Sequence, residues 1–279
     1  MASATLSNLG LVFVAGLLTA LATGLGALPF FLVEEIGDRW NVVLWGIASG
    51  IMVSASLFGL VGEGLAVVDG TLVDAAVAIG PGVLAGVGLV VVGHDVLVDA
   101  EVDAQDYEEA DFRKLVLILG ILTVHSFPEG VAVGVSFAEL GIEDPSLATV
   151  SVAGLTLPVL AVFMTVAISI HNVPEGVAIS IPLRSMGVSE YRMVWWAVFS
   201  SLPQPIGAVI AFYFVRIARE FLPFGYGFAA GAMIYLVATE FIPEALSLGE
   251  GLPGGGYREL VSGLVVGGLL MLPLAFMGG

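Results

Sequence analysis

Eight apolar runs separated by short polar links constrain this chain more strongly than any other feature of its sequence. Each run is long enough for a helix to cross the hydrocarbon core of a bilayer, which takes about 20 residues. Charged residues make up only 12% of the chain, whereas soluble domains carry about 25%. The sequence therefore predicts an all-α polytopic membrane protein, with one transmembrane domain over residues 1–279. The expected spans are residues 6–28, 42–68, 72–98, 115–137, 152–183, 193–215, 226–246 and 260–276. Pro81 in the third span and Pro158 in the long fifth span are each expected to mark either a kink or the start of the helix.

The few basic residues predict how these spans are oriented. The links after odd-numbered spans hold Arg39, Arg113, Lys114, Arg184, Arg192 and Arg258, and those after even-numbered spans hold only Arg216 and Arg219. Because basic residues are retained on the cytoplasmic side, the first set is expected to be cytoplasmic. Both termini are then extracytoplasmic in a plasma-membrane protein, and the acidic link at about residues 99–112 is a cytoplasmic loop.

Charge and cysteine content exclude several classes of function. The formal net charge is −17 with a single lysine, which predicts a halophilic source whose surface is adapted to salt. No basic patch is present to neutralise phosphates, so nucleic acid is not an expected partner. The chain has no cysteine, which excludes disulfides, thiolate metal ligands and cysteine nucleophiles.

One six-residue motif, H-x-x-P-E-G, occurs twice within the apolar runs. It spans residues 125–130 and, 46 positions later, residues 171–176. Histidine and glutamate four residues apart share one helix face, and adjacent spans run antiparallel. The motifs are therefore expected to face each other and to combine His125, Glu129, His171 and Glu175.

This residue set suits a divalent metal ion. Imidazole and carboxylate ligands fit zinc, iron and manganese, and one divalent cation offsets two glutamates that would otherwise repel each other in lipid. Pro128 and Pro174 each free a backbone carbonyl one residue before the motif histidine. Gly130 and Gly176 are expected to permit close helix contact.

Further polar groups in or near the spans are weaker candidates. A possible ion pathway includes Glu63, His94, Asp95, Glu240 and Glu244, and possible additional ligands are Met52, Ser126 and Gln204.

Two other classes of function remain open on the residues alone. An intramembrane metal-dependent hydrolase usually carries H-E-x-x-H, which does not occur here. A proton- or sodium-coupled carrier of another solute would use the same histidines and glutamates as a proton relay.

The sequence resembles the ZIP (Zrt/Irt-like) family of metal transporters, closest to its prokaryotic GufA-like branch. The two H-x-x-P-E-G motifs carry the resemblance, supported by residues 22–29 and 234–245. It implies eight transmembrane helices, with helices 1–3 and 6–8 forming an inverted repeat around helices 4 and 5. It also implies a transporter, not an enzyme, that moves divalent metal into the cytoplasm; zinc is the expected substrate, with iron, manganese or cadmium as others. The implied partners are the lipid bilayer, the metal ions and a second copy in a homodimer, and no cofactor is implied.

The resemblance also implies a site for two metal ions. The primary position would use His125, Glu129, His171 and Glu175, with Met52 approaching from the second helix. The second position would use Glu129, Asn172 and Glu175.

Two departures from the family pattern weaken that second position. Ser126 stands where the family often has asparagine, and Gln204 stands where it often has glutamate. The prediction is therefore one firm metal position and a weak second one.

Overall fold

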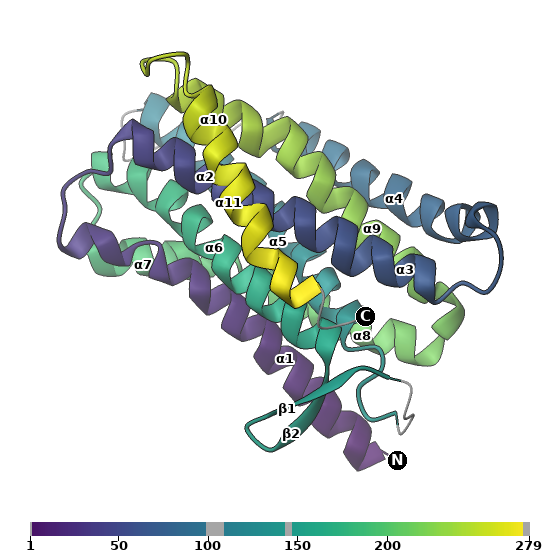
Figure 1. The fold of residues 1–279 in the computed structure, drawn as a ribbon. Coiled ribbons are helices and arrows are strands. Elements are labelled where there is room, and N and C mark those ends of the chain that lie inside the picture. Colours follow the sequence, from purple (N-terminus) through teal and green to yellow (C-terminus); the bar gives the residue numbers. More distant parts are fainter. Residues whose placement is uncertain (1, 99–108, 143–146, 276–279) are drawn as a thin grey trace.

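The computed structural model describes residues 2–98, 109–142 and 147–275, and almost all of this part is helical (Figure 1). The helices and strands are α1 (Ala2–Leu25), α2 (Asp38–Ser54), α3 (Gly62–Ala66), α4 (Leu72–Val98), α5 (Glu109–Ser136), β1 (Thr149–Val152), β2 (Leu155–Pro158), α6 (Val159–Ser185), α7 (Glu190–Ser200), α8 (Pro203–Ile217), α9 (Leu222–Leu236), α10 (Ile242–Leu248) and α11 (Tyr257–Ala275). Shorter turns are the 3-10 helices η1 (Leu28–Phe31) and η3 (Arg219–Phe221), and the π-helical segments η2 (Ala55–Val61) and η4 (Val237–Phe241). Most of the predicted acidic loop, residues 99–108, lies outside the described residues.

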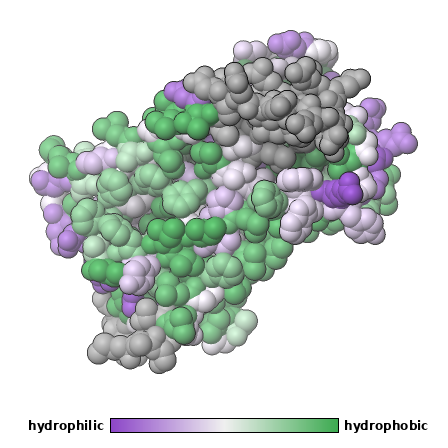
Figure 2. Space-filling model, turned by 180° about the vertical axis from the view of Figure 1, so that it is seen from behind, coloured by the Kyte–Doolittle hydropathy of each residue, from purple (hydrophilic) through white to green (hydrophobic). Residues whose placement is uncertain are grey.

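Six stretches of the described chain are long and apolar enough to cross a membrane, which confirms the polytopic class. They are Leu6–Phe31, Asp38–Ala66, Leu72–Val96, Val159–Ser185, Glu190–Ile217 and Arg219–Leu248. Each overlaps one of the predicted spans, and α5 and α11 occupy the other two. Apolar side chains on the outside include Leu84 at 74% exposure, and Figure 2 shows a broad hydrophobic surface with hydrophilic residues gathered mainly toward its edges.

The fifth predicted span begins later than expected. A β-hairpin precedes it, in which Thr149–Val152 pairs antiparallel with Leu155–Pro158, and α6 starts only at Val159. Ala153 and Gly154 join the strands with φ values of 50° and 82°, which suits the tight two-residue turn of a right-twisted hairpin. The helix starts directly after Pro158, one of the two roles expected of that proline. The hairpin before it was not predicted, because short apolar strands and a buried helix have similar hydropathy.

Prolines within the spans do not end the helices. α4 is continuous through Pro81, which was expected to mark a kink or the start of the span, and α5 and α6 continue through Pro128 and Pro174. The second and seventh spans are each interrupted by a π-helical segment, η2 and η4. Such segments are rare and often mark functional sites.

The helices form two bundles. In the first bundle, α1, α5, α6, α7 and α8 pack together, mainly through α5 on α8 and α1 on α6. In the second bundle, α2, α3, α4, α9, α10 and α11 pack together, mainly through α2 on α11 and α4 on α9. The bundles meet where α2 contacts α6 and α5 contacts α9.

Glycines lie at helix contacts both within the bundles and between them. Within the bundles, a Cβ built on Gly134 would overlap the carbonyl oxygen of Ala208, and one on Gly86 would overlap that of Phe228. These helices therefore touch backbone to backbone. Glycines that face the other bundle meet side chains instead: Gly59 meets Phe163 and Met164, Gly93 meets Val124, and Gly225 meets Val135.

Candidate metal centre

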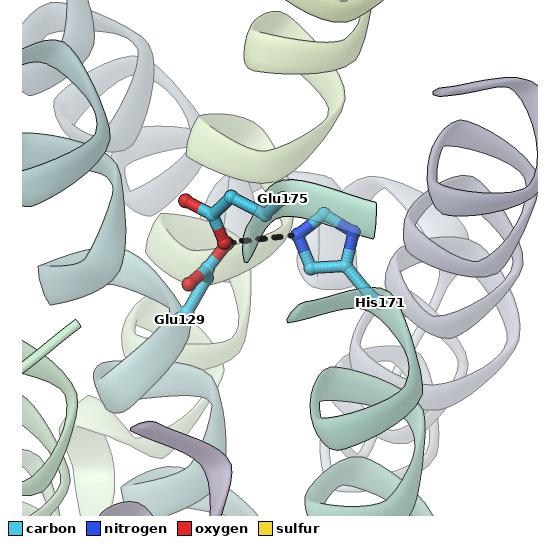
Figure 3. Close-up of side chains that lie close together, drawn as sticks. All are labelled: Glu129, His171 and Glu175. Carbon is cyan, nitrogen blue, oxygen red and sulfur yellow. Dashed lines mark hydrogen bonds and ion pairs between the residues drawn. The ribbon is translucent and has the colours of Figure 1, made fainter. Parts of the chain in front are cut away.

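Glu129 of α5 and His171 and Glu175 of α6 converge in the first bundle (Figure 3). One potential ligand atom from each lies within 4.8 Å of the others, and all three side chains have no solvent exposure. The His171 Nε2 atom lies 3.2 Å from Glu129 Oε1 and 3.9 Å from Glu175 Oε2. Two carboxylates and one imidazole nitrogen thus surround one buried point.

The repeated motif explains how these side chains reach the same place. His171 and Glu175 are one helical turn apart on α6, and Glu129 projects from α5 toward them. A Cβ on Gly130 would overlap the backbone of Gln204, and one on Gly176 would overlap the carbonyl oxygen of Thr23. The prediction that the motif glycines permit close helix contact is confirmed.

Several polar atoms at this point lack a hydrogen-bond partner. Both carboxylate oxygens of Glu175 and the Nδ1 atom of His171 are buried and unpartnered in the described structure. A buried charge with no partner costs several kcal/mol, roughly, and is tolerated where it is paired or coordinates a metal. The donor set and the unpartnered Glu175 oxygens together suit a divalent cation.

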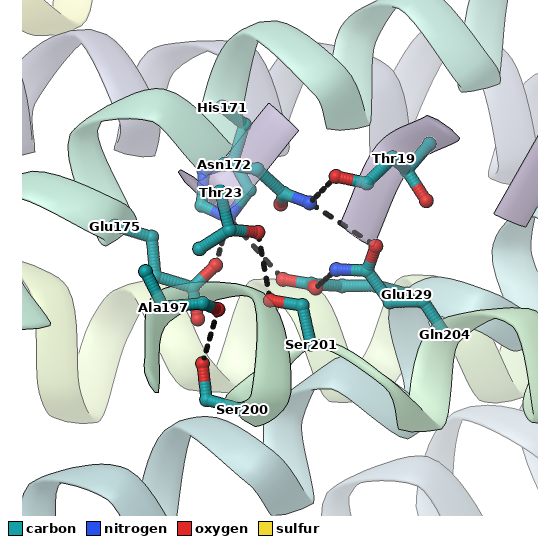
Figure 4. Close-up of polar contacts among 10 residues, drawn as sticks. All are labelled: Thr19, Thr23, Glu129, His171, Asn172, Glu175, Ala197, Ser200, Ser201 and Gln204. Carbon is teal, nitrogen blue, oxygen red and sulfur yellow. Dashed lines mark hydrogen bonds and ion pairs between the residues drawn. The ribbon is translucent and has the colours of Figure 1, made fainter. Parts of the chain in front are cut away.

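A hydrogen-bonded network supports one side of the centre (Figure 4). The Gln204 Nε2 atom donates to Glu129 Oε2 at 2.6 Å, and Asn172 Nδ2 donates to Gln204 Oε1 at 3.1 Å and to the Thr19 carbonyl at 2.7 Å. The Thr23 and Ser201 hydroxyls lie 2.7 Å apart nearby. The network thus ties α1, α5, α6 and α8 together around Glu129.

An aromatic residue of the second bundle stacks on His171 and is itself supported by a second aromatic residue. The ring of Phe241 in η4 stacks on the imidazole, with centroids 5.4 Å apart and planes 17° from parallel. Trp45 of α2 packs edge-on against Phe241 at 4.7 Å. Neither aromatic residue was identified as part of the site, since apolar residues carry no distinguishing signal in an apolar span.

His125 is not among the described His and Glu side chains whose ligand atoms converge on one point. His125 is 2% exposed, and its Nδ1 atom has no hydrogen-bond partner in the described structure. Met52 and Ser126 are also buried, at 1% and 0% exposure. Their roles as ligands stay predictions.

The expected pathway residues lie toward opposite ends of the second bundle. Near the end of α4, His94 Nδ1 lies 3.0 Å from Glu240 Oε1 of η4, beside a surface cavity of about 200 Å³ that Asp95 also lines. Half-buried Glu63 belongs to α3, close in sequence to the other end of α4, and Glu244 is exposed on α10. Glu240, which pairs with His94, directly precedes Phe241, which stacks on His171. The His94–Glu240 pair is therefore adjacent in sequence to a residue that contacts the metal centre.

Known proteins that are similar in sequence to this chain are named as zinc transporters. A family model described as "ZIP Zinc transporter" matches residues 154–275. The zinc transporter GufA of Myxococcus xanthus is 32% identical over 95% of this chain and 98% of its own length. The zinc transporter ZupT of Corynebacterium aurimucosum is 30% identical over 95% of this chain and 96% of its own length. A longer protein of Arabidopsis thaliana is 42% identical over 81% of this chain, which spans only 33% of that relative.

Proposed function

Because the chain belongs to the ZIP family and transports divalent metal cations, we propose that it carries zinc across the plasma membrane through the buried cluster of Glu129, His171 and Glu175. Its relatives are named as transporters and not as enzymes, which removes the hydrolase alternative. The single observation that carries the choice of site is the convergence of two carboxylates and an imidazole, all fully buried, within 4.8 Å.

Zinc is the proposed substrate because the ligand set is of borderline softness. Zinc accepts imidazole nitrogen and carboxylate oxygen at about 2.0–2.2 Å in tetrahedral geometry, and the chain offers no thiolate. Iron, manganese and cadmium are the competing ions. Competition among these four metals in one uptake assay distinguishes them.

We propose that transport uses relative movement of the two bundles. The cluster belongs to the first bundle, while Phe241, which stacks on His171, and Trp45, which packs on Phe241, belong to the second. Displacing one bundle along the other would uncover the ion without breaking the network that positions its ligands. The ion would enter near Glu63 and leave near His94 and Glu240, so that the termini are extracytoplasmic and zinc enters the cytoplasm.

The proposed topology has eight transmembrane helices, with α5 and α11 as the fourth and eighth. The helix–helix contacts support the inverted repeat. If each of spans 1–3 is matched with its counterpart among spans 6–8, and span 4 with span 5, the main contacting pairs of one half correspond to those of the other. Under this matching α2 on α11 corresponds to α9 on α4, α5 on α8 to α6 on α1, and α2 on α6 to α9 on α5. We retain the homodimer and the halophilic source as predictions, tested by the mass of the solubilised protein and by its salt requirement.

The test is zinc uptake into liposomes that contain the purified protein and a zinc-sensitive dye. Glu175→Gln and His171→Ala should reduce uptake to the level of empty liposomes, because each removes a ligand from the cluster. Glu250→Gln, at an exposed loop position, is the matched control and should transport normally. Normal uptake by both cluster variants would refute the assignment of the site.

A further inference from the structure

The side-chain amide of Gln204 occupies a fixed place beside Glu129. Gln204 lies in the first turn of α8, just after the break that separates α7 from α8, and its backbone N–H donates to the Ser201 carbonyl at 3.0 Å. Its backbone also packs directly on Gly130 of α5, and its side chain has no solvent exposure. The amide therefore has little freedom to move away from the carboxylate.

The neighbouring groups determine which end of the Gln204 side-chain amide, the NH₂ group or the oxygen, faces Glu129. Glu129 is ionised when it binds a metal, so Oε2 can only accept a hydrogen bond, and the Thr19 carbonyl likewise can only accept. Asn172 must then present its NH₂ group to Thr19, and the same group meets Gln204 Oε1 at 3.1 Å. Gln204 is left with its NH₂ group toward Glu129, at 2.6 Å. Reversing either amide would place oxygen against oxygen.

The two carboxylate oxygens of Glu129 therefore have different partners. Oε1 lies on the side of His171, at 3.2 Å from Nε2, where a metal ion would bind. Oε2 is covered by the N–H group of Gln204, so this oxygen is not free to bind a second cation. An amide hydrogen is a neutral substitute for that cation, since it offers a partial positive charge to the carboxylate without adding a net charge.

We propose that Gln204 is a positioning residue that limits the centre to one divalent ion by covering Glu129 Oε2. This inference rests on the proposed function of the cluster. A carboxylate in place of the amide would put two acceptor oxygens about 2.6 Å apart in the same geometry, an arrangement that requires a cation or a proton between them. The Asn172 Oδ1 atom, which is buried and unpartnered, offers a further oxygen ligand on this side.

The stoichiometry of bound metal tests this inference. Purified protein is stripped with a chelator, dialysed against ZnCl₂ and analysed for zinc per chain by mass spectrometry. The wild type should bind one ion and Gln204→Glu should bind two. A purely structural role for Gln204 would change stability or affinity and would leave the number of ions at one.

Two controls separate the possible failures. Glu175→Gln should abolish the single ion of the wild type; if the wild type binds no zinc that depends on Glu175, the proposed site fails, not only the role of Gln204. If the wild type binds two ions that depend on Glu175, or if folded Gln204→Glu still binds one, the inference about Gln204 is wrong.

A second measurement uses the wild type alone, in case Gln204→Glu does not fold. The stripped protein is loaded with MnCl₂ and examined by electron paramagnetic resonance. Paired metal ions at about 3.5–4 Å would couple their electron spins, whereas one ion gives an uncoupled spectrum. The uncoupled spectrum is expected, and a coupled spectrum would overturn the proposal.

Discussion

A disulfide between the two bundles is expected to stop transport, because the proposed mechanism uncovers the ion by movement of the bundles. The chain contains no cysteine, so cysteine pairs can be introduced without a background. A Cβ built on Gly93 of α4 lies 3.5 Å from the Cβ of Val124 on α5, and one on Gly225 of α9 lies 3.8 Å from that of Val135 on α5. Both separations fall in the range of about 3.5–4.5 Å that a disulfide spans.

The size of the effect follows from these distances. A disulfide permits about 1 Å of change between its Cβ atoms, whereas a helix that shifts by one turn along its neighbour moves about 5.4 Å. Oxidised Gly93→Cys/Val124→Cys and Gly225→Cys/Val135→Cys proteins should therefore take up zinc no faster than empty liposomes. Reduction of the disulfide should restore uptake.

A cross-link within one bundle serves as the control. The Cβ position of Gly64 on α3 lies 3.5 Å from the Cβ of Tyr226 on α9, and both helices belong to the second bundle. Oxidised Gly64→Cys/Tyr226→Cys protein should retain the uptake rate that it shows when reduced. If fully oxidised protein with a link between the bundles transports at its reduced rate, rigid movement of the bundles is not the mechanism.

Three further predictions concern stability and metal binding. Gly86→Ala should destabilise the detergent-solubilised protein by about 1–3 kcal/mol, because its Cβ overlaps the Phe228 carbonyl. Gly88→Ala, which meets nothing within 4 Å, should not do so, and equal melting temperatures would contradict the proposed backbone contact. Phe241→Ala should cost about 3–5 kcal/mol in thermal unfolding by emptying the space between His171 and the second bundle, and an unchanged melting temperature would argue against that packing. Zinc at a hundredfold excess over its dissociation constant should stabilise the wild type by about 2.7 kcal/mol, and EDTA should remove the gain; a Glu175→Gln variant that is stabilised equally would place the ion elsewhere.

The sequence predicted the membrane spans well because hydropathy along a span does not depend on its neighbours. It named Pro158 as a kink or helix start but did not reveal the hairpin before it, where two strands of four residues each continue directly into the apolar run of α6. Ala153 and Gly154 form the turn between them, but an Ala-Gly pair is common in transmembrane helices and gave no turn signal.

The candidate site was predictable where it depends on helix periodicity. Spacing of four residues placed His171 and Glu175 on one face, and the antiparallel neighbour brought Glu129 to them. The same periodicity could not decide the depth of His125, which depends on how far α5 is shifted along α6. The contribution of Thr19 is a backbone carbonyl, which every residue type provides, so the sequence could not reveal it.

The neutral amide at position 204 also determines how the occupied centre responds to the membrane potential. Two glutamates and one divalent cation sum to no net charge when His171 binds as a neutral imidazole. Moving one elementary charge through 100 mV changes its energy by about 2.3 kcal/mol, but a centre of zero net charge experiences no such force. The zinc-bound centre should therefore cross the bilayer at the same rate at every voltage, and any electrical dependence of uptake must arise in the step that returns the empty centre.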